Sequence, residues 1–102
     1  MNIPLILESR YSGTSWVLAG DSYDGLDWFS ESPKPTEEEL QDLWPQVQYE
    51  HEYSIVEGER ARAYREISDP IFFEWQRGDA TEAEWLAAVQ AVKNAHPYPK
   101  AP

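Results

Sequence analysis

Two short motifs fix where helices begin in this chain of 102 residues. "TEEE" at 36–39 and "TEAE" at 81–84 each place a threonine three residues before a glutamate, which is the capping-box pattern of a helix N-terminus. The acidic residues in each first turn also suit the positive end of the helix dipole. "SPKP" (32–35) stands directly before the first motif. We therefore expect a rigid connector there, ending a sheet that the preceding residues form.

The first thirty residues are typical of short strands. "IPLILES" (3–9) predicts a strand, with Pro4 at its start or on a sheet edge. "TSWVLA" (14–19) and "LDWFS" (26–30) are rich in aromatic and β-branched residues, and the turn-forming "GDSYDG" (20–25) joins them. These two segments predict a β-hairpin. Its apolar face would carry Trp16, Leu18, Leu26 and Trp28.

A capped helix should follow from Thr36, and its length is the main open point. Its expected buried stripe is Leu40, Leu43, Trp44 and Val47. Pro45 should kink this helix or begin a new one. Residues 47–55 alternate polar and apolar side chains, as a strand does, yet Tyr49, Tyr53, Val56, Ala63 and Ile67 also fit a helical stripe. We favour a helix over residues 48–67 and keep the strand as the alternative.

The last third predicts two further helices and an extended end. Asp69-Pro70 indicates a restart, with Asp69 as N-cap, and Gly78 should end the helix that begins there. A final helix should run from the second capping box to about Ala95. Its expected apolar face is Trp85, Leu86, Val89 and Val92. "HPYPKAP" (96–102) should be extended, because its prolines lack the amide donor.

The predicted fold is thus α+β, with a small antiparallel hairpin sheet followed by three or four α-helices. We divide the chain into residues 1–47, the hairpin with its capped helix, and residues 48–102, a helical region with an extended proline-rich tail. The two parts are expected to form one compact unit, as the length of 102 residues favours.

The net charge of the chain is concentrated in residues 1–59. This segment carries thirteen acidic and two basic side chains, whereas residues 60–102 carry six of each sign, so residues 1–59 account for the whole net charge of −11. A nucleic-acid binder needs a basic surface, so direct binding of DNA or RNA is not expected. Without cysteine or a long apolar run, we also expect no disulfide, no membrane span and an intracellular location.

Neither catalytic nor metal-binding motifs are recognisable. His51 and His96 are the only histidines, and neither belongs to a metal-ligand pattern. Asp21, Asp24 and Asp27 do not match the register of a calcium loop. We therefore expect no catalytic residues, no cofactor and no metal, and a protein that is not an enzyme.

Two groups of residues resemble a known kind of phage protein. In the first half these are Pro35, Thr36, Glu39, Leu40 and Trp44 after a Trp-bearing hairpin. In the second half they are Asp69-Pro70, Phe72-Phe73, Gln76, Gly78, Glu84-Trp85-Leu86, Val89, Lys93 and Pro97-Tyr98-Pro99. Together they resemble small bacteriophage proteins encoded near tail and tail-fibre genes, some of which are described as phage tail assembly chaperones. The resemblance covers most of the chain and brings no catalytic residues with it.

The resemblance implies a non-enzymatic role in tail or tail-fibre assembly, as an assembly chaperone or as a minor virion tail component. The expected partner is a phage tail or tail-fibre protein, met in the host bacterial cytoplasm during assembly or in the virion tail. Acidic and aromatic residues are the candidate partner-binding set: Glu50, Glu52, Glu57, Glu59, Trp44 and Tyr98. The alternative is an acidic mimic of DNA that inhibits a host DNA-binding protein.

Overall fold

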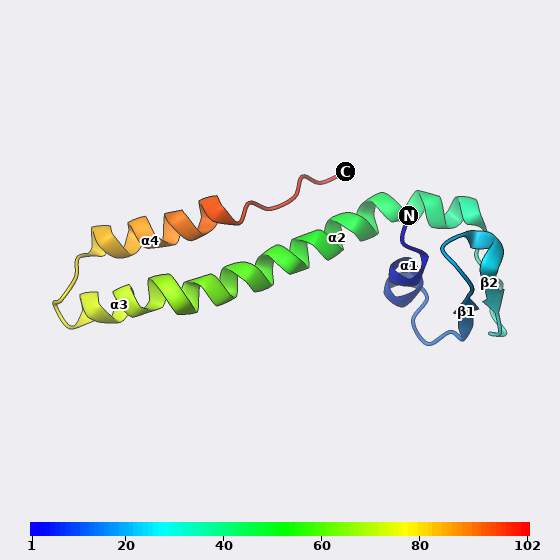
Figure 1. The fold of residues 1–102 in the computed structure, drawn as a ribbon, viewed down its shortest axis with the longest axis horizontal. Coiled ribbons are helices and arrows are strands. Elements are labelled where there is room, and N and C mark those ends of the chain that lie inside the picture. Colours follow the sequence, from blue (N-terminus) through cyan, green and yellow to red (C-terminus); the bar gives the residue numbers. More distant parts are fainter. The chain divides into compact units, whose positions relative to one another are not determined.

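The structure is a computed structural model that describes residues 1–102. Its elements are α1 (Ile3–Arg10), β1 (Trp16–Leu18), β2 (Leu26–Trp28), α2 (Glu37–Ala63), α3 (Asp69–Gln76) and α4 (Glu82–Ala95) (Figure 1). An antiparallel hairpin followed by helices confirms the predicted α+β class. The chain divides into two compact units, residues 1–50 with 101–102 and residues 51–100.

The first element of the chain is a helix, so the strand predicted at residues 3–9 is wrong. The side chain of Asn2 caps α1 by accepting a hydrogen bond from the backbone N–H of Leu5 (3.1 Å). Pro4 lies in the first turn, where the missing amide donor is not needed. Ile3, Ile6 and Leu7 are buried at helical spacing. The sheet therefore has two strands, not three.

The predicted hairpin is confirmed, including its apolar face. Trp16 pairs with Trp28 and Leu18 with Leu26, so all four side chains project to the same side of the sheet. Leu26 is buried, and the other three pack against the core of this unit. The loop between the strands needs a glycine at position 25, because a Cβ there would lie 1.9 Å from the carbonyl oxygen of Ala19.

The core of residues 1–50 combines α1, the hairpin and the start of α2. Its buried members are Ile3, Ile6, Leu7, Leu26, Leu40 and Val47. Leu43 and Trp44 are half-buried against this core, so the predicted stripe of the capped helix is confirmed. A two-stranded hairpin is at best marginally stable alone. Here its apolar face is covered by side chains of α1 and α2.

α2 begins where the capping box predicts and is longer than expected. Thr36 Oγ1 accepts a hydrogen bond from the backbone N–H of Glu39 (3.1 Å). The helix passes through Pro45 without ending and continues to Ala63. Residues 48–56 are therefore helical, and the strand alternative is wrong. Ile55 is exposed, as expected for a residue that fits only the strand pattern.

A π-helical turn at Tyr64–Ser68 joins α2 to α3, so the helix does not restart at Asp69 as predicted. Ser68 and Asp69 keep right-handed helical backbone angles, and the side chain of Ser68 makes no capping bond. Pro70 lies just after this turn. In a regular α-helix a proline here would lack the amide donor, and its ring would clash with the carbonyl four residues earlier. The wider π turn accommodates the proline without breaking the helix.

The predicted stop of α3 at Gly78 and the predicted cap of α4 at Thr81 are both confirmed. Gly78 has a left-handed φ of +84°, its N–H donates to Trp75 O (3.0 Å), and the N–H of Asp79 donates to Glu74 O (2.8 Å). These two bonds form a Schellman motif, for which a glycine is favoured. Thr81 Oγ1 then accepts from the backbone N–H of Glu84 (3.2 Å) and caps α4.

In residues 51–100, α4 lies alongside the π turn and α3 (Figure 1). The buried side chains here are small: Ala63, Ser68, Ala88 and Val92. Aromatic rings supply the remaining contact between α3 and α4. Ile67 and Leu86 were predicted to be buried but are about half exposed, whereas Ala88 and Val92 are the buried residues of α4. None of the helices has both the length and the apolarity needed to cross a bilayer.

Candidate interaction surfaces

The segment after α4 is held on α2 by aromatic and cationic contacts. The ring of Tyr98 stacks on that of Tyr53 at 4.3 Å between centroids and 13° between planes. The guanidinium carbon of Arg60 lies 4.0 Å from the centroid of the same ring. Tyr53 and Arg60 are two helical turns apart, so they share one face of α2. The predicted partner-binding residue Tyr98 is thus placed in an intramolecular contact, with 39% of its surface still exposed.

Arg60 also binds the C-terminal end of α4. Its Nε donates to the carbonyl oxygen of His96 (2.7 Å), and Nη2 donates to that of Lys93 (3.3 Å). Carbonyls at the end of a helix lack intrahelical donors, and a cation there is favoured by the helix dipole. Arg60 therefore fixes the point at which the chain leaves α4 and turns back along α2.

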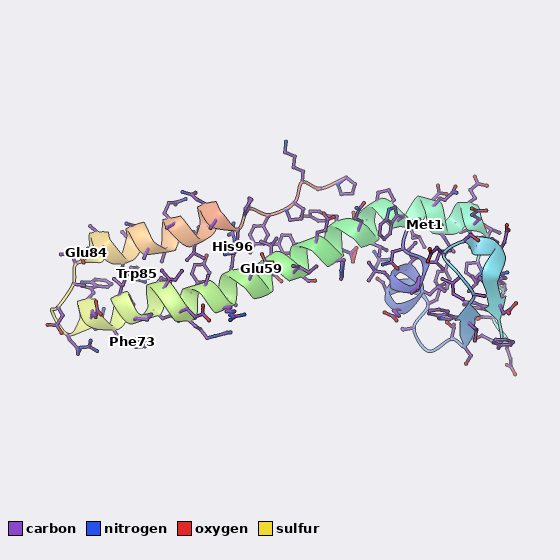
Figure 2. All side chains as sticks on the ribbon, in the orientation of Figure 1. Met1, Glu59, Phe73, Glu84, Trp85 and His96 are labelled. Carbon is purple, nitrogen blue, oxygen red and sulfur yellow. The ribbon has the colours of Figure 1, made fainter.

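Glu59, another predicted partner-binding residue, takes part in the same contact. His96 Nδ1 donates to Glu59 Oε2 (3.2 Å), since an ionised carboxylate can only accept. The labelled side chains of Glu59 and His96 lie beside each other where the tail leaves α4 (Figure 2). The tail is consequently held at both His96 and Tyr98 by side chains of α2.

Glu50 is paired with a cation in the structure. Arg10, at the end of α1, donates to both carboxylate oxygens of Glu50, at 3.2 Å and 2.5 Å. The hydrogen bond from Arg10 holds the pKa of Glu50 below its usual value, and it raises the pKa of Arg10. Glu50 therefore joins α1 to α2 rather than presenting an unpaired charge.

Trp44 and the two remaining acidic candidates are placed differently. Trp44 is half-buried against the core of residues 1–50, so its first role is in packing. Glu52 and Glu57 are exposed on α2. Of the four acidic candidates, Glu50 and Glu59 are paired, whereas Glu52 and Glu57 project into solvent without a hydrogen bond or ion pair.

An aromatic cluster joins α3 and α4. Trp85 stacks on Trp75 (5.7 Å, 21°) and tilts against Phe72 (5.4 Å), and Phe72 contacts Phe73 edge to face (5.7 Å). Figure 2 shows Trp85 between α4 and α3. Phe73 is 58% exposed, and Leu86, next to Trp85 in sequence, is 50% exposed. We call Phe72, Phe73, Trp75 and Trp85 the aromatic cluster.

The aromatic cluster has the composition of a protein-binding surface. Aromatic side chains bury a large area at low entropy cost and are enriched where partners bind most tightly. Rings of the cluster that already contact one another are held in position, and Phe73 extends the set to the solvent. The sequence signals are "FFEW" (72–75) and "EWL" (84–86), of which the periodicity assigns only Trp85 and Leu86 to an apolar helix face.

Residues 1–50 carry a hollow of mixed polarity and one further exposed aromatic ring. A hollow of about 520 Å³ is bordered by Met1, Ile3, Trp16 and Leu18, with Asp21 at its rim. Phe29, just after β2, is 65% exposed. Across the whole structure no group of three or more His, Asp or Glu side chains is placed to hold a metal ion.

These features define a small α+β protein whose functional candidates are surfaces formed by aromatic and acidic side chains. Comparisons with protein-family models, with curated proteins and with solved structures find no match for the chain. The resemblance to phage tail-associated proteins accordingly rests on the residues named for it in the sequence.

Proposed function

We propose that the protein acts without catalysis, by binding other proteins, in the assembly of a bacteriophage tail or tail fibre. It would serve as an assembly chaperone or as a minor component of the virion tail, in the host cytoplasm or in the finished particle. The observation that carries the proposal is the exposed edge of the aromatic cluster, where the ring of Phe73 contacts that of Phe72 and leaves more than half of its surface open. Phe72, Phe73 and Trp85 are also residues on which the resemblance rests.

Two surfaces would contribute differently to such binding. The aromatic cluster supplies apolar area, which determines how long a complex lasts. Glu52 and Glu57 supply exposed negative charge, which acts mainly on the rate of encounter with a basic partner. Glu50 and Glu59 bind Arg10 and His96 in the same chain, so they contribute less to the field that a partner meets.

The test is affinity capture of the tagged full-length protein from phage-infected cells, followed by mass spectrometry. Capture of tail or tail-fibre proteins would support the proposal. Phe73→Ser should abolish that capture, whereas Phe29→Ser should retain it. Phe29 is the matched control, because it is an equally exposed phenylalanine in the other unit. Capture of host nucleases or polymerase in place of tail proteins would favour the DNA-mimic alternative and overturn the proposal.

The acidic contribution is tested separately by charge reversal. Glu52→Lys with Glu57→Lys should slow association with a tail partner and leave the fold intact, since neither side chain is buried or capping. Reversal of Glu8 and Glu31, two exposed acids that precede α2, is the matched control and should have a smaller effect. Mass spectrometry of purified virions then separates the two forms of the proposal, since only a tail component stays in the particle.

A further inference from the structure

The tail contact has the features of a bound peptide. None of residues 96–100 is buried, so the segment adds little to a core. Instead it is held by ring stacking on Tyr53, by the guanidinium of Arg60 and by the carboxylate of Glu59. These three side chains form what we call the tail site. A few specific side-chain contacts on an accessible surface are typical of a recognised peptide. A segment that serves only to pack the fold would instead bury its apolar side chains.

The bound segment is suited to recognition by its own chemistry. Pro97 and Pro99 fix φ near −65° on both sides of Tyr98, so little conformational freedom is lost when the segment binds. Its charged residues, His96 when protonated and Lys100, are basic, and the segment contains no acid. The surrounding face of α2 carries Glu59 and the exposed Glu52 and Glu57, so the charges are complementary.

We propose that the tail site is a binding site for a proline-flanked tyrosine segment of a partner protein, and that the chain's own tail occupies it as an intramolecular competitor. The tail reaches the site across only two residues after α4, which gives it a local concentration on the order of millimolar. A partner segment must compete with this local concentration, so a segment of weaker affinity than the tail binds only after the tail has left the site. The inference does not depend on a role in phage tail assembly, because it is tested on the purified protein.

The experiment titrates the full-length protein with a synthetic peptide, acetyl-AHPYPKAP, followed by amide chemical shifts in NMR. Tyr98→Ala removes the competing ring from Tyr53 and from the guanidinium of Arg60, while Glu59 and the Nε of Arg60 keep their contacts with His96. This variant should bind the peptide at least about tenfold more tightly than the wild-type protein, because the tethered competitor is lost. A peptide in which alanine replaces the tyrosine should not bind.

Variants of the site itself complete the design. In the Tyr98→Ala background, Arg60→Lys keeps the positive charge at the end of α4 but loses the planar guanidinium over the ring, and should weaken the peptide at least about threefold. Arg62→Lys is the matched control on the same helix and should leave the affinity unchanged. Arg62 pairs with Glu66, and no hydrogen bond, ion pair or ring contact joins it to Tyr98.

Several outcomes would overturn the proposal. Equal affinity of the wild-type protein and Tyr98→Ala would mean that the tail does not occupy a peptide site. Equal binding of the alanine peptide would mean that the tyrosine is not recognised. Sedimentation showing that the wild-type protein dimerises by exchanging tails would make a second copy the occupant.

A second measurement covers the case in which Tyr98→Ala loses helical circular dichroism. In the wild-type protein, several-millimolar peptide should shift the amide signals of His96, Tyr98 and Lys100 toward those of a free chain. A tail that stays docked while peptide saturates the protein would overturn the proposal equally.

Discussion

Replacing Trp85 by alanine tests how the helices of residues 51–100 are held together. The buried side chains of this unit are small, so the rings between α3 and α4 should supply much of its stability. Trp85 makes two ring contacts, with Trp75 and Phe72, and pairs of this kind contribute about 0.5–1.5 kcal/mol each beyond burial. The two contacts together therefore account for about 1–3 kcal/mol.

The full loss includes the area that the indole buries. Truncating a buried tryptophan to alanine costs about 3–5 kcal/mol, and Trp85 is partly exposed, so we expect the lower end, about 3 kcal/mol. Urea denaturation followed by far-UV circular dichroism measures the free energy of unfolding. Trp85→Phe keeps a ring against Phe72 and should lose less than half as much as Trp85→Ala.

Leu86→Ala is the matched control, one residue along the same helix. Leu86 is half exposed and outside the ring contacts, so its truncation should cost less than about 1 kcal/mol. If Trp85→Ala and Leu86→Ala destabilise the protein equally, the stacked rings do not hold α4 against α3. The indole would then be an exposed binding residue and not a packing one.

Further predictions concern the helix caps and the ion pair of residues 1–50. Thr36→Ala and Thr81→Ala each remove a hydrogen-bond acceptor from a helix N-terminus and should each lower the free energy of unfolding by about 1 kcal/mol, measured by urea denaturation; no loss in either would mean that these threonines do not cap. The pKa of Glu50 is lower in the folded state, so the ion pair with Arg10 stabilises at neutral pH, and this contribution disappears as the pH falls through the lowered pKa. The stability difference between wild type and Glu50→Gln should therefore be largest at neutral pH and vanish in acid; a difference independent of pH would refute the pairing.

Local sequence signals predicted the elements whose ends are determined by neighbouring residues. The capping threonines bond to amides three residues away, and Gly78 ends α3 through bonds within the same turn, so short motifs were sufficient. α1 was misread because Ile3, Ile6 and Leu7 fit a short apolar strand as well as a helix. The signal that favours the helix is the cap by Asn2, which lies just before the apolar run.

The contacts that build the candidate site join residues far apart in sequence. Arg10 and Glu50 are 40 positions apart, and Glu59 and His96 are 37 apart. Acidic composition identified Glu50 and Glu59 as candidates, but it could not show that each already has a partner. The docking of Tyr98 on Tyr53 and Arg60 depends on where α4 ends relative to α2, which no local pattern contains. The burial of Ala88 in place of Leu86 has the same cause.

Because Tyr64–Ser68 form a π-helical turn, the number of residues in this segment matters more for the fold than which residues occupy its exposed positions. Removing one residue between Tyr64 and Ser68 would restore an ordinary helix and rotate everything that follows by about 100°. α4 contacts α2 through Arg60, before the turn, and α3 through Trp85, after it. After such a deletion these two contacts could not be made together, and the ring of Pro70 would meet the carbonyl four residues earlier. Substitutions at exposed positions such as Arg65 should be tolerated where a single-residue deletion is not.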